Sequence, residues 1–177
     1  MIKLITCPDY LQSILDKEVS SNASNESHKT SFTSHLKSAI YDWRVERQWN
    51  KPYSFIYSFD DKGFIFFTYT QKFPRHCTLR HIFVKFNNRV SGVGTKLFDF
   101  MKSKMNADNV NILRMFINPP ALRFYQKHNI KNFHGKSKTG LDFYYGDING
   151  NLISLPKSQK RYVVKNDDGN KLSEWIY

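Results

Sequence analysis

The stretch NRVSGVGTKLF, which runs from Asn88 to Phe98, joins an apolar run to an amphipathic one. It places an arginine, a serine and two glycines where a strand-like pattern gives way to a helical pattern. Gly92 and Gly94 have no side chains, so the backbone N–H groups can turn inward at the start of the helix. These groups and the positive end of the helix dipole then face one point. The stretch therefore predicts an anion site at a strand–helix turn.

The spacing of the glycines separates this turn from two other phosphate-binding loops. It is neither G-x-G-x-x-G nor G-x-x-x-x-G-K-[ST], so the sequence favours neither a dinucleotide-binding fold nor a nucleoside-triphosphatase P-loop. A basic turn of this kind also occurs as a plain structural turn without a ligand. The pattern RxxGxG, from Arg89 to Gly94, therefore has to be interpreted with the rest of the chain.

The charge of the chain is strongly positive and uneven. Its 177 residues carry 27 Lys and Arg against 15 Asp and Glu, a net charge of +12. Residues 1–50 hold six charges of each sign, so the excess lies in residues 51–177. A basic surface there suits a polyanionic partner such as nucleic acid, or a phosphate-rich cofactor. It equally suits a solvated face that serves solubility, and composition leaves both interpretations open.

Length, cysteine content and hydropathy set further limits. The length predicts one domain, or one domain with a small appendage. Two cysteines, Cys7 and Cys77, lack the paired spacing of a disulfide framework or a zinc site, and no metal site is expected. No apolar run approaches the length of a membrane span, and no secretory signal pattern opens the chain. We therefore expect a cytoplasmic protein with no membrane partner.

Hydrophobic periodicity predicts a mixed α/β domain with a central sheet. The expected elements are a strand at Lys3–Thr6, helices from Asp9 and over Phe32–Gln48, strands at Tyr53–Phe59, Phe64–Tyr69 and Leu79–Phe86, a helix at Val93–Met105, a strand at Val110–Ile117, a helix at Ala121–Lys127 and a strand at Leu141–Ile148. Near the C-terminus, Asp147–Ser154 and Asn166–Ser173 each place a Gly-Asn pair between strand-like runs, which is typical of hairpin turns. The expected organisation is one domain over residues 1–148 with an extension of extra C-terminal β-hairpins over residues 149–177.

Two segments together resemble a known enzyme family. Ile82 to Val84, followed by the Arg89–Gly94 turn, resembles the acetyl-CoA-binding motif of the GNAT acyltransferase superfamily, written (R/Q)xxGx(G/A). Asn118 to Lys127 reads NPPALRFYQK and is similar to the second motif of that family, NxxAxxxYxK. The resemblance covers Pro52 to Ile148, and it implies a mixed, mostly antiparallel sheet that splays between the two motif strands and is flanked by helices.

One departure from the family pattern follows the second motif. The family usually continues with Gly-Phe after its tyrosine helix, whereas this chain has Asn129 and Ile130. That position shapes a turn, so the change leaves the resemblance intact.

The resemblance implies acetyl-CoA, or another acyl-CoA, as the cofactor and gives roles to particular residues. The backbone of Phe83 and Val84 would align the pantetheine arm and polarise the thioester carbonyl, and Asn118 would form a hydrogen bond near that arm. Tyr125 would protonate the leaving thiolate as a general acid. The alternative for Tyr125 is a helix aromatic that fills the core, a task that Phe124 beside it could take instead. The CoA pyrophosphate would be bound by the turn, which comprises Arg89, Val90, Ser91, Gly92, Val93, Gly94 and Thr95.

The general base is less evident, because the motif strand Thr78–Val84 contains no acid. Strand alternation puts Arg80 on one side and His81 on the other. An imidazole titrates near neutrality, as a base requires, although a lone histidine in an apolar strand is more often structural. Arg80 would instead attract an anionic substrate. Asp42 and Glu46, late on the second expected helix, are further candidates for the base, and an amine that arrives neutral, such as an aminoacyl ester, would need no strong base.

The acceptor side would be shaped by the N-terminal helices. Trp43 and Arg47 combine an aromatic and a basic side chain, which together can stack on bases and contact phosphates. They equally suit a core tryptophan beside an exposed arginine. The favoured function is direct acetyl transfer to an amine, with an acceptor on nucleic acid (aminoacyl-tRNA or a modified base) slightly ahead of protein or small-molecule amines. The alternative is a non-catalytic nucleic-acid-binding module of the same fold. The sequence fits a monomer or a homodimer.

Overall fold

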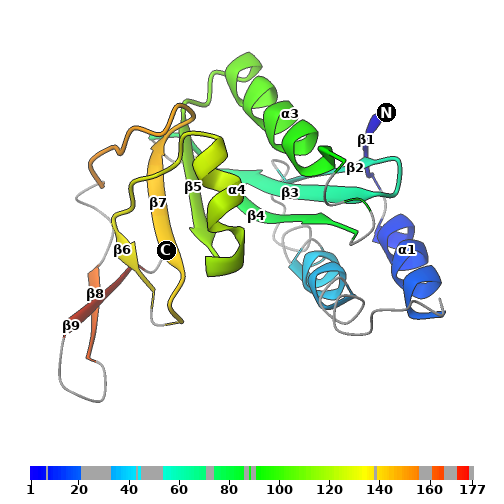
Figure 1. Cartoon of the computed structure of the whole chain (residues 1–177), viewed down its shortest axis with the longest axis horizontal. Coiled ribbons are helices and arrows are strands. Elements are labelled where there is room, and N and C mark those ends of the chain that lie inside the picture. The colour runs from blue at the N-terminus through cyan, green and yellow to red at the C-terminus, as the bar shows by residue number, and fades with distance from the viewer. Residues whose placement is uncertain are drawn as a thin grey trace. The chain divides into compact units, whose positions relative to one another are not determined.

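The computed structural model describes the chain except for residues 7, 21–32, 43, 45–53, 71–73, 86–87, 89–90, 138, 156–160, 166–170 and 176–177. It divides into two compact units (Figure 1). Unit 1 comprises Met1–Tyr69 and Leu79–Asp108, and unit 2 comprises Thr70–Thr78 and Asn109–Tyr177. Each unit contains one of the two sequence motifs, so each is described separately.

Unit 1 is built on an antiparallel meander of aromatic and β-branched strands. β1 (Ile2–Leu4) pairs with β2 (Ser54–Phe59), which pairs with β3 (Gly63–Tyr69) in the register Ser54↔Thr68 to Phe59↔Gly63. The turn between β2 and β3 has positive φ at Asp60 and Asp61, as primed hairpin turns require. The expected hairpin with this turn is confirmed.

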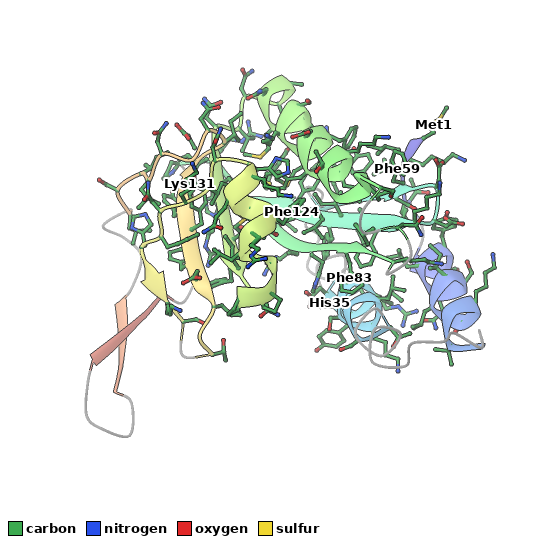
Figure 2. The ribbon with its side chains drawn as sticks, in the orientation of Figure 1. Met1, His35, Phe59, Phe83, Phe124 and Lys131 are labelled. Carbon is green, nitrogen blue, oxygen red and sulfur yellow. The ribbon has the colours of Figure 1, made fainter. Side chains whose placement is uncertain are left out.

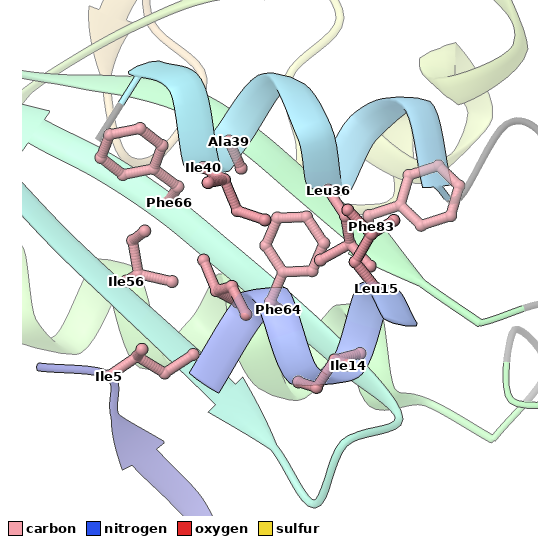
Figure 3. Close-up of a cluster of buried hydrophobic side chains, with 11 residues drawn as sticks. Ile5, Ile14, Leu15, Leu36, Ala39, Ile40, Ile56, Phe64, Phe66 and Phe83 are labelled. Carbon is pink, nitrogen blue, oxygen red and sulfur yellow. The ribbon is translucent and has the colours of Figure 1, made fainter. Parts of the chain in front are cut away.

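Helices cover both faces of these strands. α1 (Pro8–Ser20) and a helix over residues 33–42 lie on one side of β2 to β4, and α3 (Val93–Ala107) lies on the other (Figure 1). The side chains between the strands and the first two helices form one buried cluster (Figure 3), made of Ile5, Leu11, Ile14, Leu15, Leu36, Ala39, Ile40, Ile56, Phe64, Phe66 and Phe83. Phe83 is the member contributed by β4 (His76–Val84). The strand that carries the first motif is therefore fixed by this core.

Unit 2 contains the parallel part of the sheet. The first residues of β4 pair in parallel with β5 (Ile112–Ile117), from His76↔Ile112 to Thr78↔Arg114. β7 (Asp142–Asp147) pairs antiparallel with β5 along its whole length, and the two-residue β6 (Gly135–Lys136) pairs with β7. A 3₁₀ turn, η2 (Pro119–Ala121), leads from β5 into α4 (Leu122–Lys127). Near the C-terminus, β8 (Arg161–Lys165) pairs antiparallel with β9 (Lys171–Trp175).

The described strands follow the order β1-β2-β3-β4-β5-β7-β6 in one sheet. The expected mixed, mostly antiparallel sheet with flanking helices is confirmed. β4 begins at His76 rather than at Leu79, because its first three residues pair with β5 and tertiary pairing extends the strand. How the C-terminal extension packs, and the domain boundary at residue 148, remain predictions. None of the helices in the described part of the chain is long and apolar enough to cross a membrane.

Candidate active site

The turn that opens α3 has the backbone that the glycine pattern predicts. Gly92 precedes the first helical residue and has a φ of 74°, in the left-handed region that favours glycine. A Cβ built on Gly92 would meet nothing within 4 Å, so the backbone, and not crowding, requires glycine there. No side chain caps this helix end, and its first turn holds no acidic residue. The N-terminal N–H groups of α3 are therefore arranged to attract an anion.

The neighbouring residues fix the shape of this turn. The Ser91 hydroxyl donates a hydrogen bond to the Asn88 carbonyl at 2.6 Å, and the Ser91 N–H donates to the same oxygen at 3.2 Å. Val93 is buried and anchors the start of α3, while Thr95 is exposed. Gly94 lies in the first helical turn. Arg89 and Val90, which complete the predicted site, lie outside the described residues.

The motif strand has one exposed residue and a buried residue near its end. Arg80 is exposed, whereas Phe83 is buried among the helices that cover the opposite face. Val84 ends the strand, and the Lys85 N–H that follows donates to the Lys62 carbonyl at 2.9 Å. Phe83 and Val84 are therefore held in place by the core on one side and by the β2–β3 turn on the other.

The His81 side chain contacts residues of a neighbouring helix and of a neighbouring strand. Its Nε2 lies 3.1 Å from a carboxylate oxygen of Asp42, which comes from the helix over residues 33–42. The Phe66 ring stacks on the imidazole with ring centroids 6.1 Å apart, and the His35 ring meets it edge-on at the same centroid distance. The His35 ring also packs on the Phe83 ring with centroids 4.6 Å apart, and Figure 2 labels these two residues next to each other. Two polar side chains of one helix therefore surround the histidine of the motif strand.

The side chains of His81 and Asp42 differ in how far they are exposed to solvent. The His81 side chain is 15% exposed and that of Asp42 is 39% exposed. An imidazole with one nitrogen bound to a carboxylate keeps its other nitrogen, here Nδ1, for a second partner.

The second motif forms the start of α4 in unit 2. Asn118 is exposed and extended, with φ −71° and ψ 134°, and its carbonyl accepts a hydrogen bond from the Ala121 N–H at 2.8 Å. Pro119 and Pro120 occupy the first positions of the 3₁₀ turn, where a missing N–H costs little. This rigid turn fixes the direction in which α4 begins.

Tyr125 is the buried residue of α4. Its side chain is 5% exposed, whereas Phe124, whose ring meets it edge-on at 5.1 Å, is half-buried. Of these two neighbouring side chains, Tyr125 is thus the one that α4 buries in the core. Burial raises the pKa of the Tyr125 phenol well above its ordinary value, because the phenolate loses its hydration. Tyr125 therefore stays protonated at neutral pH.

The backbone of Tyr125 also ends its helix. The Ile130 N–H donates to the Tyr125 carbonyl and the Asn129 N–H donates to the Gln126 carbonyl, both at 3.1 Å. Asn129 has a φ of 67° and Ile130 is fully buried. This is the Schellman arrangement that usually takes glycine, followed by a buried apolar residue. Asn129 and Ile130 therefore build the turn that Gly-Phe would build.

Two predicted acceptor residues, Trp43 and Arg47, lie outside the described residues. Within the described ranges, no group of three or more His, Cys, Asp and Glu side chains is placed to hold a metal ion. His35 was not singled out by the sequence, because a histidine in a polar helix carries no signal until the helix is seen on β4. Asp42, one of the two acidic candidates on that helix, contacts His81, and the other candidate, Glu46, lies outside the described residues.

The sequence of the chain matches a family model over residues 21–130, and that model describes the acetyltransferase (GNAT) family. The match includes both motifs and the segment that carries His35, Asp42 and His81. The search of the curated proteins found no match.

Solved structures with the same fold share little sequence with the chain. A protein described as a GNAT-family acetyltransferase from Desulfovibrio desulfuricans is 14% identical with a TM-score of 0.61, and the alignment covers 84% of this chain and 98% of that one. The PaiA N-acetyltransferase from Thermoplasma acidophilum, solved with coenzyme A, is 15% identical with a TM-score of 0.54 and coverages of 83% and 99%. An N-acetyltransferase from Staphylococcus aureus Mu50 is 18% identical, with a TM-score of 0.52 and coverages of 84% and 98%.

Proposed function

The chain belongs to the acetyltransferase (GNAT) family, and on this premise we propose that it transfers an acetyl group from acetyl-CoA directly to an amine. The observation that carries the proposal is the turn at Gly92, where a left-handed glycine opens α3 without a side-chain cap. The free N–H groups of an uncapped helix N-terminus bind a pyrophosphate when the adjacent turn contains glycines, because no side chain then blocks its approach. The residues present therefore fit the cofactor that the family uses.

The cofactor-binding residues follow from this fit. The N–H groups from Ser91 to Thr95, together with Arg89 and Val90, would hold the pyrophosphate. The backbone of Phe83 and Val84, supported from both sides, would align the pantetheine arm, and Asn118 would hydrogen-bond to it. When bound, the thioester supplies the acetyl group. Another acyl-CoA with the same pyrophosphate would bind in the same way.

Tyr125 is the proposed general acid. The acceptor nitrogen forms a bond to the carbonyl carbon, the carbon–sulfur bond breaks, and the sulfur leaves with the electron pair and takes a proton. Burial raises the pKa of the Tyr125 phenol, so the proton is present at every pH at which the enzyme would work. A single positioned acid contributes about 10²- to 10⁴-fold in rate.

His81 is the proposed general base, and Arg80 is proposed to attract an anionic acceptor. His81 offers Nδ1 for the proton of the amine because Asp42 binds Nε2. Arg80 is exposed on the opposite face of β4, so a substrate does not have to displace the core to reach it. The two side chains therefore serve different parts of the acceptor.

The identity of the acceptor is a separate proposal. A nucleic-acid-borne amine is favoured only by the net charge of +12, its position in residues 51–177 and the pairing of Trp43 with Arg47. The same features suit a protein or small-molecule amine if the basic face is merely solvated. The protein would act in the cytoplasm, as a monomer or a homodimer.

The proposal is tested by the release of free thiol from acetyl-CoA with wild type and Tyr125→Phe. The acceptors are spermidine, a lysine-containing peptide and an aminoacyl-tRNA. We expect turnover with at least one acceptor and a loss of about 10²-fold or more in kcat for the variant. Tyr41→Phe, at a side chain that is 69% exposed, is the matched control and retains full turnover.

Two outcomes would contradict the proposal. Equal turnover by Tyr125→Phe and wild type removes the phenol from the chemistry. No turnover by wild type, together with salt-sensitive binding of single- or double-stranded nucleic acid, supports the non-catalytic binding module instead.

A further inference from the structure

We infer that Asp42 is a positioning residue that directs proton uptake to Nδ1 of His81, and that the acceptor is an alkylammonium group, which arrives protonated. The inference rests on the proposed function, because it assigns a substrate class to the same site. Its basis is the juxtaposition of Asp42 and His35, from one helix, around the histidine of the motif strand.

The first step of the argument concerns the ring nitrogens. Nε2 of His81 lies 3.1 Å from the Asp42 carboxylate, so the N–H of the neutral imidazole is held there and the lone pair is at Nδ1. Phe66 stacks on one side of the ring and His35 meets its edge, which limits rotation about the side-chain torsions. The imidazole is therefore held in one orientation with one basic atom.

The second step concerns charge. When Nδ1 accepts a proton the ring becomes a cation, and the Asp42 carboxylate is its direct counter-charge. Asp42 and His35 are the titratable groups in the contacts described above, and both come from the helix over residues 33–42. β3 contributes the uncharged Phe66, and Arg80, next in the strand, is exposed. The Asp42 carboxylate is therefore placed to balance the charge that the ring gains during the reaction.

The third step concerns the substrate for which such a base is useful. At pH 7 about one in 2,500 ε-amino groups of lysine is neutral, whereas about one in seven α-amino groups is neutral. An acceptor of the second kind attacks without help, so a histidine held by a carboxylate would add little. An alkylammonium acceptor first transfers a proton to Nδ1, and its freed lone pair then forms the bond to the acyl carbon. His81 later releases that proton to water, so protons and electrons balance.

The position of His81 on the strand supports the same role. His81 and Phe83 are two residues apart and therefore lie on one face of β4. His35 touches both side chains, with centroid distances of 6.1 Å to His81 and 4.6 Å to Phe83. The base is thus two residues before the backbone that is proposed to align the thioester. His35 keeps these two side chains in register.

Two amines that differ in acidity test the substrate class. The probes are Nα-acetyl-lysine amide, which offers only an ε-amine, and alanine amide, which offers only an α-amine. We expect His81→Gln to lower kcat at pH 7 by about 10²-fold or more with the lysine derivative and by much less with alanine amide. Raising the pH from 7 to 10 should restore turnover by this variant with the lysine derivative, because the amine then loses its proton in solution. An equal loss with both amines, or no recovery at high pH, overturns the substrate class.

A double-mutant cycle tests the positioning role of Asp42. Asp42→Asn should lower kcat about tenfold in wild type, as loss of a carboxylate partner does at metal-bound histidines, and should change nothing in the His81→Gln background. KM for acetyl-CoA should stay unchanged. Asp16→Asn, at an exposed aspartate of α1, is the control and should leave kcat intact. A loss of the same size in both backgrounds shows a structural role and overturns the inference.

A third measurement does not depend on turnover. In ¹⁵N-labelled protein the Nε2–H proton of His81 should be visible by NMR and protected from exchange, and Asp42→Leu should abolish that signal. If wild type lacks the signal, the pair does not form and the inference is wrong. If the signal is present but neither amine is acetylated, the proposed function fails, and the assigned role for Asp42 fails with it.

Discussion

His81 in unit 1 and Tyr125 in unit 2 are held by opposite means. His81 lies on a strand, is 15% exposed, and is fixed by the carboxylate of a residue 39 positions earlier in the chain. Tyr125 lies on a short helix, is 5% exposed, and is fixed by burial and by the cap that its own carbonyl makes with Ile130. Burial raises the pKa of the Tyr125 phenol, whereas a side-chain contact fixes the orientation of the His81 ring. The first environment depends on packing and the second on a single polar partner.

The comparison also predicts which kinds of mutation affect each of the two residues. The surroundings of His81 depend on how a separate helix packs, because Asp42 and His35 reach β4 only through the cluster around Leu36 and Ala39. The end of the Tyr125 helix depends on backbone hydrogen bonds within six residues of sequence. A change to the core should therefore affect the base, and a local change to the turn should affect the acid.

The largest expected effect concerns the packing of the helix that carries Asp42. Leu36 is fully buried between the helix over residues 33–42 and the strands, so Leu36→Ala should lower the free energy of unfolding by about 2 to 5 kcal/mol. Denaturant unfolding measures this loss. Tyr41→Ala, at an exposed position of the same helix, should stay within about 0.5 kcal/mol of wild type. Equal stability of Leu36→Ala and wild type would show that this helix does not pack on the sheet.

The next largest effect is the change in stability with pH that the buried Tyr125 phenol causes. Because the pKa of Tyr125 is raised in the folded protein, the unfolded chain loses this proton first as the pH rises. Stability due to the buried phenol is therefore complete below the ordinary tyrosine pKa and falls above it, by about 1.4 kcal/mol per pH unit for one proton. Tyr125→Phe should lose less stability than wild type between pH 10 and 12, measured by thermal unfolding.

Tyr41→Phe, at a side chain that is 69% exposed, serves as the control for this measurement. Other buried tyrosines such as Tyr144 also have raised pKa values and give a background that wild type and variant share. An identical alkaline loss in Tyr125→Phe and wild type would contradict the burial of this phenol.

The smallest effect tests the cap of the tyrosine helix. Asn129 has a φ of 67°, so Asn129→Gly should keep or slightly raise stability, whereas Asn129→Ala should cost about 1 kcal/mol. The two variants together isolate backbone strain from loss of the side chain. If Ala and Gly are equivalent at this position, the left-handed turn is absent in solution.

How far the sequence predicts this protein depends on the distance between the residues involved. The hairpin at Asp60 and Asp61 and the glycine turn at Gly92 are local patterns, and the structure has both. The two-residue β6 was missed, because two residues carry no periodicity. The pair of Asp42 with His81 was not predicted either. It depends on which face of a helix meets which face of a strand 39 residues later, and no local pattern records that.

The binding of acetyl-CoA at the glycine turn is the central claim, and calorimetric titration tests it most directly. Wild type is compared with Gly92→Leu and with Gly140→Leu, because Gly140 has nearly the same φ, 77°, and equally open surroundings but lies outside the motif. The account predicts micromolar binding by wild type and by Gly140→Leu, and binding weaker by about tenfold or more, at least 1.4 kcal/mol, for Gly92→Leu. No binding by wild type, or equal binding by all three proteins, would contradict it.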